Sequence, residues 1–162
     1  MPVHTFRNVI HVEHVVIETS KSYTRVQAEI ERLMPPIDAE LAVLLQDGLT
    51  DRLKQRLDAA AELSIFLKRN HGMLLGVFGD ARHAMQYELG HPLTAMAMTR
   101  YQLGAANYAP LRAVVFEDDA GGARIEYDLP SSLFGQFGDE RVTEVARGLD
   151  VALMSALCSA AK

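Results

Sequence analysis

The residues best suited to chemistry lie near the N-terminus, where positions 11 to 14 read HVEH. Imidazole and carboxylate groups bind metal ions and transfer protons. The surrounding residues 9 to 18 are rich in β-branched side chains, which predicts a strand. Side chains alternate along a strand, so His14 faces one way and His11 with Glu13 faces the other. His11 and Glu13 are the pair that a metal- or redox-linked enzyme would use, but the spacing supplies no three or four zinc ligands, and no metal site is predicted.

His14 falls on the more apolar face of this predicted strand, together with Ile10, Val12 and Val16. A polar side chain in such a place needs a hydrogen-bond partner if it is buried. Two interpretations stay open. Either His14 is a core histidine satisfied by a neighbour, or it projects into a ligand cavity.

Residues 111 to 128 predict a β-hairpin, in which two apolar-rich segments flank a polar turn that contains glycine. Pairing Phe116 with Ile125 matches apolar residues on one face and opposite charges on the other, so we expect this register. Arg112 then lies on the same face as Phe116 and Tyr127. An arginine on an apolar face is costly unless it is paired.

Arg112 therefore either extends to water from the end of its strand or binds an anionic ligand at the mouth of a pocket. In the second case Tyr108 or Tyr127 would lie beside it. The predicted ligand-binding residues are His14, Arg112, Tyr127 and Tyr108. Motifs for a nucleophile elbow, a P-loop or a dinucleotide fold are not found, so no catalytic residue is assigned and no cofactor is expected.

The elements that must position these residues alternate between strands and helices. A stripe that begins after Ser22 predicts a helix, which Pro35 and Pro36 end. Two short helices are predicted as an insert around residues 36 to 61. Pro92 suits the first position of another helix, and Asp139 caps a long final helix with one apolar stripe. This mixture indicates an α+β fold with helices packed on an antiparallel sheet.

The composition restricts the partners. The chain has 162 residues and predicts a single domain over residues 1 to 162. A formal net charge of −5 argues against binding to nucleic acid. The single cysteine, Cys158, fits a reducing compartment, and without a targeting segment or a long apolar run we expect a cytoplasmic protein with no membrane partner.

Several segments in the second half resemble the domain-of-unknown-function family 302 (DUF 302). They are YELGHPLTA at 87 to 95, YAPLRAVVFED at 108 to 118, and RIEYDLPSSLFGQFG at 124 to 138. The opening VVIETSKSYTRVQAEIERL is similar to that family's first strand and helix. The resemblance covers most of residues 9 to 158 and is weakest at 35 to 62.

The resemblance implies an architecture like that of the TATA-box-binding protein, a curved antiparallel sheet with helices packed on one face, and a homodimer. It implies no reaction. Where the family usually has Asn at the start of a helix, this chain has His91, which is either a tolerated surface change or a local specialisation. Three functions are carried forward: binding of a small molecule or anion in a pocket between sheet and helices, a metal- or redox-linked enzyme, and a structural dimerisation module.

Overall fold

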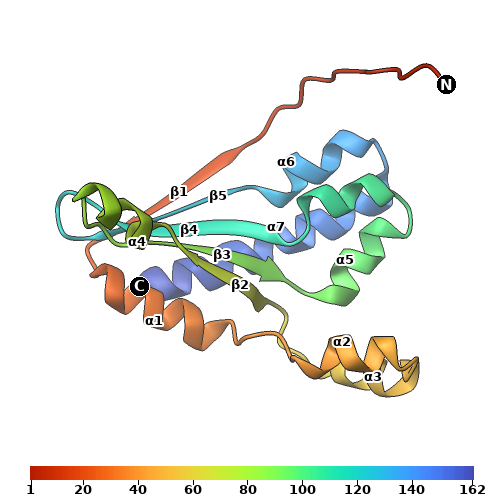
Figure 1. Ribbon diagram of the computed structural model, residues 1–162, viewed down its shortest axis with the longest axis horizontal. Helices are drawn as coiled ribbons and strands as arrows, with labels where there is room; N and C mark the ends of the chain where they lie inside the picture. The colour runs from red at the N-terminus through yellow and green to blue at the C-terminus, as the bar shows by residue number, and fades with distance from the viewer.

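The structure is a computed structural model that describes residues 1–162, apart from the side chain of Leu45. The helices and strands follow the predicted alternation (Figure 1). The strands are β1 (His14–Thr19), β2 (Ser64–Asn70), β3 (Ala84–Gly90), β4 (Leu111–Glu117) and β5 (Ala123–Asp128). The α-helices are α1 (Tyr23–Leu33), α2 (Glu40–Gln46), α3 (Thr50–Asp58), α4 (His71–Leu75), α5 (Pro92–Thr99), α6 (Pro130–Phe134) and α7 (Glu140–Ala161), and the 3-10 helices are η1 (Gly76–Phe78), η2 (Leu103–Tyr108) and η3 (Gly135–Phe137).

The five strands form one antiparallel sheet in the order β1-β5-β4-β3-β2. One face packs against α1 and α7, and its side chains are the buried ones, such as Val115 and Ile125. The long stripe predicted for the last helix is buried, with Leu149, Leu153 and Leu157 at spacings of four. The prediction of an α+β fold with helices on one face of an antiparallel sheet is confirmed.

The first strand is shorter than predicted. β1 begins at His14, whereas the β-branched residues had predicted a strand from residue 9. Its partner β5 ends at Asp128, directly opposite His14, and the chain then turns into α6. The residues before His14 consequently have no strand to pair with, and Figure 1 shows them running away from the sheet.

The predicted hairpin register is wrong by one residue. Phe116 lies opposite Arg124, and Ile125 lies opposite Val115. The turn sets this register, because Asp118 Oδ1 accepts hydrogen bonds from the backbone of the residues that follow it, at 2.8 and 2.9 Å. Both faces of β4 carry apolar side chains, so matching apolar pairs could not identify the face that turns inward.

The insert of α2 and α3 is confirmed within the predicted residues 36 to 61. It hangs from the edge of the sheet, where the backbone of Ile65 exchanges hydrogen bonds with Pro35 and Ile37, each at 2.9 Å. In Figure 1 it lies beyond the start of β2, below α5. This position brings α3 close to the start of α5.

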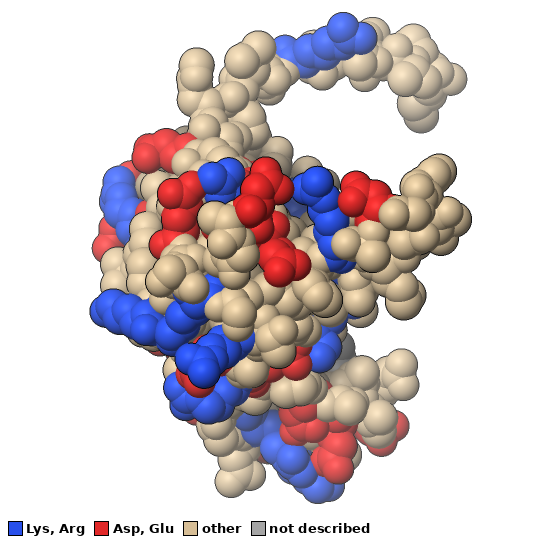
Figure 2. All heavy atoms as spheres, turned by 90° about the vertical axis from the view of Figure 1, so that its left-hand side faces the viewer, with Lys and Arg blue, Asp and Glu red and all other residues tan. Residues whose placement is uncertain are grey.

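A lobe of α4 and η1 joins β2 to β3 at the opposite end of the sheet (Figure 1). Asn70 Oδ1 caps α4 by accepting a hydrogen bond from the Met73 amide at 2.9 Å. Gly72 packs so closely on the next strand that a Cβ there would lie 2.0 Å from the Arg82 carbonyl oxygen. The lobe projects from the body without charged residues at its tip (Figure 2). Its exposed apolar residues are Met73, Leu74, Leu75, Val77 and Phe78.

Candidate functional site

The four predicted ligand-binding residues do not converge on one place. His14 and Arg112 lie on the face of the sheet that no helix covers, called the open face below. Tyr127 is 2% exposed and lies on the other face, where its hydroxyl donates to Met154 Sδ at 3.3 Å. The expectation that Arg112 and Tyr127 share a face is wrong, because it rested on the slipped register.

Burial is the main cause that raises the pKa of Tyr127, to about 12. Its hydroxyl therefore stays protonated in the core, where the ring packs and the hydroxyl has one weak acceptor, the Met154 sulfur. Tyr108 lies at the end of η2, where its ring packs edge-on against Phe134 and Phe137 at 6.2 Å between centroids. Neither tyrosine contacts His14 or Arg112.

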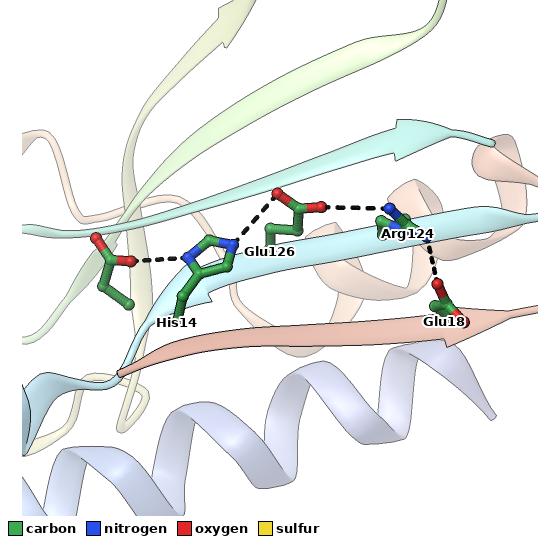
Figure 3. Close-up of polar contacts among 5 residues, drawn as sticks. His14, Glu18, Arg124 and Glu126 are labelled. Atoms are coloured by element: carbon green, nitrogen blue, oxygen red, sulfur yellow. Dashed lines mark hydrogen bonds and ion pairs between the residues drawn. The ribbon is translucent and has the colours of Figure 1, made fainter. Parts of the chain in front are cut away.

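His14 is the centre of a charged network on the open face (Figure 3). Its Nδ1 lies 2.9 Å from Asp128 Oδ1, and its Nε2 lies 3.3 Å from Glu126 Oε2. Glu126 also faces Arg124 at 3.8 Å, and Arg124 in turn pairs with Glu18. Neighbouring positions on β1 and β5 bring these side chains together, because cross-strand partners on one face lie side by side.

The carboxylates favour the charged imidazole. The hydrogen bond with Asp128 is the largest cause that raises the pKa of His14 above its ordinary value of 6.5, and Glu126 adds to it. An imidazolium uses both nitrogens as donors and has no lone pair for a metal ion. Over the described residues, no group of three or more His, Cys, Asp or Glu side chains could hold a metal ion.

His14 is therefore neither in the core nor at a pocket wall. Its imidazole is 52% exposed, on the open face of an edge strand. The residues of the proposed chelating pair, His11 and Glu13, precede β1 and are exposed. Glu13 instead ties the start of β1 to α6, because its backbone amide donates to Ser132 Oγ at 3.0 Å.

A cavity of about 210 Å³ lies between the covered face of the sheet and the helices. The end of β3 and the start of β4 form one wall, and α5, α6 and α7 form the others; these elements meet at the right of Figure 1. Its lining is apolar apart from two side chains, His91 and Thr94. The larger apolar side chains among its lining residues are Phe66, Leu89, Met98, Leu111, Phe134 and Leu149.

His91 is held at the edge of this cavity by both of its ring nitrogens. Nδ1 accepts a hydrogen bond from the Leu93 amide at 3.2 Å and thereby caps α5. Nε2 lies 3.0 Å from the Leu57 carbonyl oxygen, to which it must donate. The imidazole thus uses both ring nitrogens at once, one toward α5 and the other toward α3.

His91 connects two parts of the chain. Its second ring nitrogen reaches α3 in the insert, while the first caps α5. Asn could make the cap but is too short for both contacts. His91 therefore joins the insert to α5.

The sequence led us to expect a pocket between the sheet and the helices, but none of the four predicted ligand-binding residues lines this cavity. Its walls come from five separate segments, and each apolar residue by itself has the pattern of ordinary core. The one local signal in the sequence was His91, a histidine at a helix cap next to Pro92. It marked one edge of the cavity but did not show that the ring contacts Leu57. No helix in the described part of the chain is long and apolar enough to cross a membrane.

Comparisons with known proteins agree with the fold. The crystal structure of the uncharacterized conserved protein DUF302 from Bacillus stearothermophilus is similar, with a TM-score of 0.66 and 16% sequence identity over 92% of this chain and 98% of that one. No match was found among curated proteins. The model of the family "Domain of unknown function DUF302" matches residues 46–160, which excludes β1 and α1 but includes every lining residue of the cavity. The chain belongs to the DUF302 family.

Proposed function

We propose that this protein binds a small molecule in the cavity between the sheet and the helices. The observation that carries the proposal is the cavity itself, which has about 210 Å³ of space within walls that are almost wholly apolar. An apolar concave site with a few polar groups is the usual form of a ligand site.

The cavity does not favour the anion that Arg112 had suggested. Arg112 lies on the open face, on the other side of the sheet from the cavity, and no lysine or arginine lines the walls. An anion there would lose its hydration without gaining a counter-charge. The proposal is accordingly restricted to small molecules of apolar character.

A pair of matched variants tests this proposal. Ala95 lines the cavity, whereas Ala97 lies on the same helix outside the lining. We expect Ala95→Leu to fill the space and abolish binding of small ring compounds such as toluene, measured by NMR chemical-shift changes at Met98 and Leu111. Ala97→Leu should bind as the parent does. If the parent shows no saturable change with any such compound, the proposed function is wrong.

We also propose, as a second function, that the chain forms a homodimer through the open face. The β1–β5 half of this face has three carboxylates against one arginine and the His14 imidazole, while the β4–β2 half has two arginines and one carboxylate. A two-fold axis along the central strand β4 would place the acidic half of one copy over the basic half of the other. The charged residues are His14, Glu18, Arg124, Glu126 and Asp128 in the first half and Arg69, Glu88 and Arg112 in the second.

Apolar side chains lie between the charges on this face, with Phe116 and Val114 on β4 beside the supposed axis and Val16 46% exposed on β1. Light scattering after size exclusion tests the dimer. Phe116→Lys should yield a monomer, and Val151→Lys, a change at a 72% exposed position on α7, should not. A monomeric parent, or a dimer that Phe116→Lys leaves intact, contradicts the proposal.

A further inference from the structure

We infer that the ligand of the cavity is an uncharged, ring-sized molecule with one hydrogen-bonding group, which the Thr94 hydroxyl contacts. This inference rests on the proposed small-molecule function and names the class of ligand. Three properties of the walls carry it: their charge, their size and their hydrogen-bonding capacity.

The charge of the ligand follows from the lining. None of the lining residues is Asp, Glu, Lys or Arg, and both ring nitrogens of His91 are already in contact with backbone partners. A carboxylate or ammonium group among these walls would find no counter-charge to offset the hydration that it gives up on entering. The cavity therefore selects against both charged forms.

The size of the ligand follows from the volume. An apolar cavity of about 150 Å³ holds one benzene molecule. The 210 Å³ found here accommodates a six-membered ring with a few further heavy atoms. Phe66 and Phe134 supply aromatic surface, and the Met98 thioether makes favourable contacts with ring edges.

We infer one hydrogen-bonding group on the ligand from the hydrogen bonds of the two polar lining residues, His91 and Thr94. Both nitrogens of His91 already have partners, so its ring offers a flat wall and no further hydrogen bond. The Thr94 hydroxyl makes no hydrogen bond to any residue that the structure describes. It is thus the one lining side-chain group with hydrogen-bonding capacity left for a ligand hydroxyl or carbonyl.

Three probes of similar size separate these properties. Toluene, phenol and benzoate share one ring and carry a methyl, a hydroxyl and a carboxylate group. Dissociation constants are measured by NMR titration of the parent, of Thr94→Val, and of Thr99→Val at the end of the same helix as a control. Thermal unfolding of each variant checks that it is folded.

We expect phenol and toluene to bind and benzoate to fail. Thr94→Val should lower the preference for phenol over toluene by about fivefold, the usual effect of one hydrogen bond. Thr99→Val should leave that ratio unchanged. Benzoate binding as tightly as phenol would overturn the neutral class, and an unchanged ratio in Thr94→Val would overturn the role of the hydroxyl. If neither toluene nor phenol binds the parent, the cavity is not a ligand site and the proposed function fails with this inference.

Discussion

Replacing His91 tests whether one side chain both caps α5 and holds the insert. In His91→Ala the Leu93 amide loses its acceptor, which for a helix cap costs about 1 kcal/mol. The second bond, to the Leu57 carbonyl, is worth about 1 kcal/mol more. We expect a loss of about 2 kcal/mol in unfolding free energy, or about 4–8 °C in Tm for a chain of this size.

His91→Asn separates the two contacts. Asn retains the cap but cannot reach Leu57, so only about 1 kcal/mol should be lost. Urea and thermal unfolding measure the total loss of stability in each variant, and amide hydrogen exchange shows which part of the chain is destabilised. Exchange at Leu93 should accelerate in His91→Ala and stay near the parent rate in His91→Asn, while exchange in α3 should accelerate in both. The reasoning is refuted if the two variants are equally unstable and the Leu93 amide exchanges at the same rate in both.

Two further predictions concern the open face and the lobe. The pKa of His14 is raised in the folded state, so its contribution to stability is present when the pH is below its ordinary value and is lost as the pH rises through the raised one. His14→Gln should therefore lower the free energy of unfolding more at about pH 5.5 than at about pH 8.5. The difference should be less than about 1 kcal/mol, because the pair with Asp128 is exposed to solvent. An equal loss at both pH values would contradict this prediction. Gly72→Ala should cost at least about 2 kcal/mol, because its Cβ would meet the Arg82 carbonyl oxygen. Gly76→Ala, where nothing lies within 4 Å, is the control that should unfold at or above the parent temperature.

The sequence predicted most elements but not how they face one another. Pro92 and Asp139 mark helix starts through local chemistry, and both helices begin where expected. The hairpin also lies where its turn residues placed it. Register and orientation depend on contacts from distant segments, so Phe116 was assigned to the wrong cross-strand partner. His14 was likewise expected on an apolar face. The orientation of β1 is set by β5 and α7, which lie far away in the sequence.

The candidate site was less predictable than the fold. His14 and Arg112 were singled out because they interrupt apolar patterns, and that signal correctly marks one face of a sheet. It could not show that this face is open. A cavity has no pattern of its own in a sequence, because it is space left between side chains such as Leu89 and Leu149 that are typical of any core.

The place of β1 at the sheet edge affects how the chain folds during its synthesis. β1 is synthesised before the other strands, yet its partner is β5. Ile17 therefore cannot pair until Ile125, which lies opposite it, has been synthesised. At ribosomal rates of about 5–20 residues per second, that delay is roughly 5–22 seconds. The β2–β3–β4 part of the sheet can assemble in the meantime, and α1 can already pack on β4, while β1 has no strand to pair with. Nascent chains that end before Ala123 therefore carry β1 as an unpaired strand.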